Sequence, residues 1–222
     1  MIARLLNKKE NHKMKIDSII FDLDGTLWDS SENVVNSFNE VLEKCDDIKK
    51  LITVEDMKSV MGMLLDDIAK KFWPYLTDER RDEVQKACTS NEVKYLEKHG
   101  GILFEGLEET LKILSEKYKL FIVSNCQVGY IEAFYKSHGL EKYFTDYENP
   151  GRTGLSKGEN IKLVIERNNL KKPVYVGDTN GDYLATKVAG IPFIHAKYGF
   201  GKIEDQVIEI NDIRELQHVE KL

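Results

Sequence analysis

The chain has 222 residues and a formal net charge of -6, with 41% hydrophobic and 32% charged residues. That balance is typical of a soluble globular protein that buries its own core, and it excludes fibrous and disordered classes. The acidic net charge provides no broad cationic surface for a phosphate backbone, so we expect no nucleic acid as a partner.

Residues 1–13 are expected to be an N-terminal extension ahead of the fold. They are basic and carry only a brief apolar patch at Leu5 and Leu6, so they lack the apolar core of a signal peptide. No apolar run approaches the length of a membrane span, and we expect no membrane partner. Three widely spaced cysteines favour a reducing cytoplasm over a disulfide framework or a zinc site. A monomer and a homodimer both fit the sequence.

The first predicted strand covers residues 16–21, where an apolar, β-branched run ends at turn residues. Residues 30–99 then show helical periodicity with many charges and no strand, which predicts a helical insertion. From Gly100 onward, predicted helices and strands alternate. The helices are expected at 107–117, 129–138, 157–169 and 182–189, and the strands at 120–123, 174–176 and 191–194.

This alternation predicts an α/β fold with a doubly wound parallel sheet that is covered by helices on both faces. The core domain is expected to comprise residues 14–29 and 100–222, and residues 30–99 to form a helical cap domain that closes over the strand ends. Hinges are expected near residues 28–31 and 100–105. In such a sheet, the ligand lies beyond the carboxyl ends of the strands.

Four polar clusters stand at or just after a predicted strand end or at a helix start. They are Asp22, Asp24 and Thr26; Ser124 and Asn125; Lys157; and Asp178 and Asp182. Each alone is open to an ordinary reading as turn residues, helix N-terminal charges or a solvated lysine. A calcium loop is excluded, because Leu27 and Tyr183 occupy the positions of its required glycine and Ala189 stands where one closing glutamate belongs. Two acidic motifs at matched strand ends point instead to a shared site.

The order of these four motifs resembles that of the haloacid dehalogenase superfamily, over about residues 14–201. The helical stretch matches the cap of its phosphoglycolate phosphatase and β-phosphoglucomutase-like group. The resemblance implies a Mg2+-dependent phosphatase in which Asp22 is the covalent nucleophile and Asp24 the general acid and base. It implies Mg2+ ligands from Asp22, the Asp24 backbone carbonyl and Asp178. Asp182 would orient metal-bound water or Lys157.

The same resemblance assigns Lys157 as the catalytic cation, and Thr26 and Ser124 as hydrogen-bond donors to the transferring phosphoryl group. Asn125 would be a substrate contact beside them. The chemistry of the residues agrees, because an attacking carboxylate repels a phosphate dianion unless positive charge stands beside it. Two carboxylates brought together by the sheet, Asp22 and Asp178, would supply the hard oxygen ligands that Mg2+ prefers.

The expected substrate is a small phosphorylated metabolite, with phosphoglycolate first because the cap and hinge look most like that group. A phosphosugar mutase of the β-phosphoglucomutase kind stays open, since its core motifs would be identical. A dehalogenase needs no acid two residues after the nucleophile, so Asp24 argues against it. A non-catalytic binding module is a further alternative, although the catalytic set is intact. In the cap, Met61, Met63, Leu64 and Leu65 are expected to be core rather than specificity residues.

Overall fold

The computed structural model describes residues 15–222, and its centre is a six-stranded sheet in which every neighbouring pair is parallel. In spatial order the strands are β5 (Asp146–Glu148), β4 (Lys119–Val123), β1 (Ser18–Phe21), β6 (Pro173–Gly177), β7 (Phe193–Ala196) and β8 (Ile208–Ile210). The chain adds strands first on the β4 side of β1 and then on the β6 side. The strand order therefore reverses beside β1, where open α/β sheets bind their ligands.

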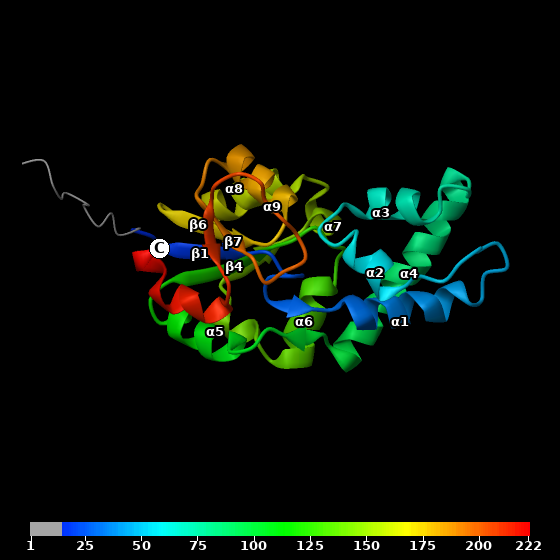
Figure 1. Ribbon diagram of the computed structural model, residues 1–222, viewed down its shortest axis with the longest axis horizontal. Coiled ribbons are helices and arrows are strands. Elements are labelled where there is room, and N and C mark those ends of the chain that lie inside the picture. The colour runs from blue at the N-terminus through cyan, green and yellow to red at the C-terminus, as the bar shows by residue number, and fades with distance from the viewer. Residues whose placement is uncertain (1–14) are drawn as a thin grey trace, which may run out of the picture.

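Helices cover both faces of the sheet, as predicted (Figure 1). One face packs against α5 (Leu107–Ser115), α6 (Tyr130–His138) and the 3-10 segment η2 (Ile213–Lys221). The other face packs against α8 (Lys157–Arg167) and α9 (Asn180–Ala189). Alternate residues of β1 explain the two layers, because Ile19 and Phe21 belong to the first face and Ile20 to the second, all without exposed surface. A strand buried on both faces is apolar throughout.

Four helices fill residues 31–99, where the helical insertion was expected. They are α1 (Ser31–Leu42), α2 (Val54–Lys58), α3 (Leu65–Phe72) and α4 (Asp78–His99). They lie beyond one end of the sheet, at the right of Figure 1. The Thr77 hydroxyl caps α4 at its start, and Gly100 ends it with a φ of 68°, a conformation that favours glycine. Helix α4 packs between α1 and α6 and so joins this helical layer to the core.

Two short antiparallel strands, β2 (Trp28–Asp29) and β3 (Ile102–Leu103), pair where the chain enters and leaves the helical segment. They coincide with the two expected hinges, although no sequence pattern predicts that these residues pair. The sequence reading also missed the edge strands β5 and β8, the short helix α7 (Pro150–Thr153) and the 3-10 turn η1 (Glu141–Tyr143). Three-residue edge strands carry too few apolar residues to show a period.

The predicted extension at residues 1–13 lies outside the described residues. Across residues 15–222, none of the helices combines the length and the apolar character that crossing a membrane requires.

Candidate active site

The carboxyl ends of three neighbouring strands bring the predicted site residues together. Asp22 directly follows β1, Ser124 follows β4 and Asp178 follows β6. Because these strands are parallel, their carboxyl ends meet at one edge of the sheet. Lys157 reaches the same edge as the first residue of α8, which begins at a capping box formed by Ser156. All four side chains are buried, which is rare for charged residues unless they are paired.

The ammonium group of Lys157 joins two of the carboxylates. Its Nζ lies 3.0 Å from Asp22 Oδ1 and 2.5 Å from Asp182 Oδ1. Burial opposes the charged form of Lys157, but the carboxylates of Asp182 and Asp22 outweigh it and hold the pKa of the lysine above its ordinary value. Burial and the neighbouring Asp182 carboxylate raise the pKa of Asp22. A single cation therefore does not fully compensate the negative charge gathered here.

Carboxylate oxygens of Asp22, Asp178 and Asp182 all lie within 4.8 Å of one another. Both oxygens of Asp182 are already engaged, Oδ1 by Lys157 and Oδ2 by the backbone and hydroxyl of Thr179. Asp178 differs, because its Oδ2 accepts from the backbone of Phe200 at 2.7 Å whereas its buried Oδ1 has no partner within the described chain.

The pKa of Asp178 is raised, chiefly by burial and then by the charges of Asp182 and Asp22. An unpartnered buried carboxylate oxygen beside a second carboxylate fits a hard divalent cation such as Mg2+. The donor set therefore agrees with the expected cofactor at Asp22 and Asp178. Asp182, with its oxygens engaged elsewhere, is instead placed to hold Lys157.

Gly25 allows this close packing of the loop after β1 against the loop after β6. Its φ is +77°, and a Cβ atom at this position would lie 2.3 Å from Asp178 Oδ2. No other residue type combines that backbone conformation with the required space. The glycine between Asp24 and Thr26 is therefore a steric requirement of the paired carboxylates.

The Asp24 side chain is not part of the cluster formed by Asp22, Asp178 and Asp182, and three donors hold it. Its Oδ1 accepts from Trp28 Nε1 at 2.9 Å, Ser30 Oγ at 2.6 Å and Tyr130 OH at 2.9 Å. Burial raises the pKa of Asp24, while the hydrogen bonds from Ser30, Tyr130 and Trp28 act against that rise without cancelling it. A fixed carboxyl with a raised pKa suits a group that gives up and retakes a proton during the reaction.

The three predicted phosphate and substrate contacts, Thr26, Ser124 and Asn125, lie in the loops after β1 and β4. Thr26 and Ser124 are buried, and the Thr26 hydroxyl has no partner within residues 15–222. Asn125 also contacts the helical segment, because its amide donates to the backbone carbonyl of Gly62 at 2.9 Å. Its Oδ1 atom is buried without a partner among the described residues. Asn125 thus links the loop after β4 to the segment between α2 and α3.

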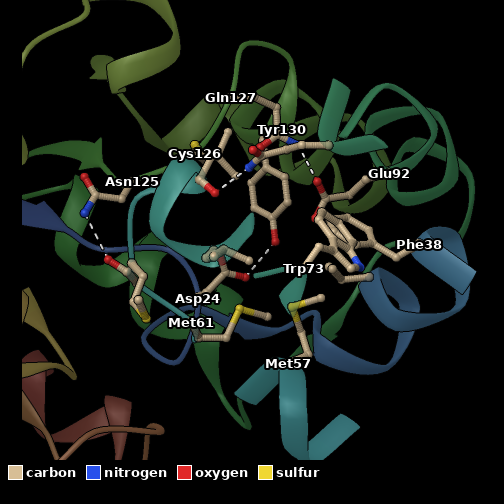
Figure 2. A pocket seen from close by; sticks show the side chains of 16 residues that line it. Asp24, Phe38, Met57, Met61, Trp73, Glu92, Asn125, Cys126, Gln127 and Tyr130 are labelled. Atoms are coloured by element: carbon tan, nitrogen blue, oxygen red, sulfur yellow. Dashed lines mark hydrogen bonds between the residues drawn. The ribbon is translucent and has the colours of Figure 1, made fainter. Parts of the chain in front are cut away.

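A small cavity adjoins Asp24 on the side of the helical segment (Figure 2). Its volume is about 40 Å³, more than one water molecule requires. Helix α4 contributes Glu92, which is only 5% exposed and accepts a hydrogen bond from the Gln127 amide. Burial raises the pKa of Glu92 to about 8, with the Gln127 hydrogen bond opposing the shift and the charge of Asp24 adding to it.

The sequence reading missed Tyr130, Gln127 and Glu92. The signal for Glu92 was available, because it lies four residues after buried Cys88 and four before buried Leu96 on the inward stripe of α4. The expectation for the cap side chains also needs correction. Two of them, Met61 and Met63, pack against the core cluster, and Leu65 joins them in lining the cavity, while Leu64 is 45% exposed.

Comparison with known proteins agrees with this geometry. The family model of haloacid dehalogenase-like hydrolases matches residues 19–196. Two relatives, each named pyrophosphatase PpaX, come from Listeria welshimeri and Halalkalibacterium halodurans. The first is 28% identical over 79% of this chain and 80% of its own length, and the second 29% over 80% and 82%.

Solved structures share the fold. A haloacid dehalogenase-like family hydrolase from Streptococcus pneumoniae has a TM-score of 0.77 at 22% identity, covering 90% of this chain and 96% of its own. A predicted phosphoglycolate phosphatase from Haemophilus somnus has a TM-score of 0.75 at 20% identity, covering 94% and 98%. The predicted fold and family are thereby confirmed. The chain belongs to the haloacid dehalogenase-like hydrolases.

Proposed function

We propose that this hydrolase is a Mg2+-dependent phosphatase that cleaves a small phosphomonoester through an aspartyl-phosphate on Asp22. The observation that carries the proposal is the contact of buried Asp22 with Lys157, at the strand edge where Asp178 offers an unpartnered carboxylate oxygen. Phosphoryl transfer to an aspartate requires a nucleophilic carboxylate beside a cation and an oxygen that is free to bind a metal ion.

In the first half-reaction, an Asp22 oxygen forms a bond to phosphorus while the bond from phosphorus to the leaving oxygen breaks. Asp24 gives its proton to that leaving oxygen, so the alcohol departs neutral at this atom. In the second half-reaction, Asp24 takes a proton from water, and the water oxygen attacks the same phosphorus. The bond to Asp22 breaks, and inorganic phosphate and the free carboxylate are restored.

Charge around the phosphoryl group is balanced by the residues that surround Asp22. Lys157 supplies one positive charge, and Asp182 holds its ammonium group in place. Thr26 and Ser124 would donate hydrogen bonds to the transferring oxygens. Asp22, the Asp24 backbone carbonyl and Asp178 would hold Mg2+, which when bound supplies the further positive charge that lets a phosphate dianion approach two carboxylates.

We further propose that residues 30–99 act as a cap domain on a core of residues 14–29 and 100–222. Two contacts support a closed arrangement: Asn125 bonds the Gly62 carbonyl, and Lys58 of α2 pairs with Asp29 at 2.8 Å. Closure excludes water while the aspartyl-phosphate forms. A cytoplasmic location and a monomeric or homodimeric state stay predictions.

Two candidate substrates and two alternative functions are compared with this proposal. Pyrophosphate is a candidate substrate because the curated relatives are named pyrophosphatases, and phosphoglycolate is the substrate predicted from the sequence. A phosphosugar mutase would use the same core residues but pass the phosphoryl group to a sugar. A binding module without chemistry would show no turnover.

The test is phosphate release from a panel of phosphomonoesters and pyrophosphate, with Mg2+ or with EDTA, comparing wild type with Asp22→Asn. We expect Mg2+-dependent release that the substitution abolishes, because an amide is a far weaker nucleophile than a carboxylate. Undiminished release by Asp22→Asn would overturn the proposed nucleophile. Exchange of phosphate between sugar positions, with a bisphosphate primer present, would favour the mutase instead.

A further inference from the structure

The cavity beside Asp24 is where a leaving group would lie, because Asp24 is the proposed proton donor to its oxygen. Sixteen residues line this cavity, and in the described part of the chain not one of them is Lys, Arg or His (Figure 2). The lining does contain two carboxyl groups, Asp24 and Glu92. The lining therefore offers acidic groups and no cation, in contrast to the phosphate site around Lys157.

The polar atoms that lack partners in this cavity are acceptors. The Gln127 amide bonds Glu92 at Oε2, and no described contact reaches Glu92 Oε1. Asn125 Oδ1 is likewise buried without a partner among the described residues. An acceptor such as Glu92 Oε1, left free on the cavity wall, suits a ligand that brings hydrogen-bond donors.

The remaining walls suit a cation with an apolar surface. Phe38, Trp73 and Tyr130 contribute aromatic rings, and Met57 and Met61 contribute thioethers (Figure 2). Aromatic faces attract ammonium groups through the ring quadrupole, and the effect grows when water is excluded. An ammonium group beside Glu92 favours the ionised form of that carboxyl, which then supplies the counter-charge that a desolvated ammonium group needs.

An anionic leaving group meets the opposite environment. The carboxylate of phosphoglycolate or the second phosphate of pyrophosphate would be buried near Asp24 and Glu92 without a cation in the lining. Desolvation of that anion would then have no compensating cation, which opposes binding and is one way in which proteins discriminate against wrong ligands. A neutral alcohol would avoid that cost but would form no ion pair with Glu92.

Building on the proposed phosphatase function, we propose that the substrate is the phosphomonoester of a small amino alcohol, whose ammonium group binds Glu92 within the aromatic and thioether walls. Hydrolysis then yields inorganic phosphate and the free amino alcohol, whose oxygen carries the proton from Asp24. The small volume of the cavity places a primary ammonium ahead of a bulkier quaternary one.

The experiment compares kcat/KM for phosphoethanolamine and phosphocholine with that for glycerol phosphate, phosphoglycolate and pyrophosphate. We expect phosphoethanolamine to exceed each neutral or anionic substrate by at least about tenfold, equivalent to one favourable contact of about 1.4 kcal/mol. Glu92→Gln should reduce the ratio of phosphoethanolamine to glycerol phosphate by about tenfold or more. Glu79→Gln, an exposed position on the same helix, should leave the ratio unchanged.

The outcomes separate this inference from the function on which it rests. Mg2+-dependent turnover that favours glycerol phosphate, phosphoglycolate or pyrophosphate would overturn the amino-alcohol assignment and leave the phosphatase standing. An unchanged ratio in Glu92→Gln would do the same. If no substrate turns over, the phosphatase proposal fails. Calorimetric titration of phosphoethanolamine into wild type and Glu92→Gln then tests the binding of the ammonium group to Glu92 separately from catalysis. Equal affinities of the two proteins, or no binding to either, would overturn the amino-alcohol assignment.

Discussion

Replacing Glu92 by glutamine should stabilise the protein in a pH-dependent way. The substitution keeps the shape of the side chain and an oxygen acceptor for the Gln127 amide, but it removes the ionisable group. In the unfolded chain Glu92 has its ordinary pKa of 4.5, whereas burial raises the pKa in the folded protein to about 8. The folded state therefore retains a proton that the unfolded state has already lost. The part of the free energy of unfolding that comes from protonated Glu92 is fully present below pH 4.5 and is lost as the pH rises through 8.

The size of the effect follows from the separation of the two pKa values. At pH 7 the unfolded carboxyl lies about 2.5 units above its pKa, and at about 1.4 kcal/mol per unit this corresponds to roughly 3 kcal/mol. Glu92 is only 5% exposed, so solvent screening reduces this figure little. The free energy of unfolding of Glu92→Gln should thus exceed that of wild type by up to about 3 kcal/mol at pH 7. The two should converge near pH 4.5.

Urea unfolding measured at several pH values between 4.5 and 8, with EDTA present, checks this prediction. Asp22 and Asp178 also titrate in this range, but they are common to both proteins and cancel in the difference. Glu79→Gln is the matched control on the same helix and should show no pH-dependent difference from wild type. A difference for Glu92→Gln that is constant with pH, or that has the opposite sign, would refute the reasoning.

Two further substitutions test how Asp24 is oriented and how the two loops pack. Tyr130→Phe removes one hydrogen-bond donor to Asp24, so kcat should fall roughly tenfold and the alkaline limb of the pH profile of kcat should move to higher pH. Tyr135→Phe is the control, because the Tyr135 hydroxyl has no partner among the described residues. An unchanged pH profile would contradict this positioning role. Gly25→Ala should abolish Mg2+-dependent turnover, because its Cβ atom would collide with Asp178. Gly154 also has a positive φ, +70°, but a Cβ atom there would meet no atom within 4 Å. Gly154→Ala should therefore lose only about 1–2 kcal/mol of stability and keep its activity. Equal activities of the two alanine variants would exclude the steric explanation.

The core fold could be predicted because its signals are local. The apolar run before Asp22 and the helix–strand alternation after Gly100 specify a parallel sheet, and the topology then brings strand-end residues to one edge. Asp22, Ser124 and Asp178 were expected to meet for this reason, and the structure places them at that edge.

The leaving-group side of the site could not be predicted in the same way. The contact of Asp24 with Tyr130 joins residues 106 positions apart, and no period or spacing encodes it. Glu92 lies in a mostly polar helix, where one inward glutamate resembles its exposed neighbours until the packing of α4 is known. Met61 reads as a core residue because cavity walls and cores use the same apolar side chains. Specificity therefore depends on tertiary packing that local sequence patterns do not report.

The central claim is that Asp22 carries the phosphoryl group, and trapping that intermediate tests it most directly. In Asp24→Asn, p-nitrophenyl phosphate should still transfer its phosphoryl group, because nitrophenolate leaves without protonation, while hydrolysis of the intermediate stalls for lack of a base. The variant is mixed with Mg2+ and substrate labelled in its phosphoryl group, and the reaction is then quenched with acid. Close to one label per chain should be found on the peptide that contains Asp22. The double variant with Asp22→Asn should carry none. Label on another peptide, or steady phosphate release by Asp22→Asn without any labelled chain, would contradict the account.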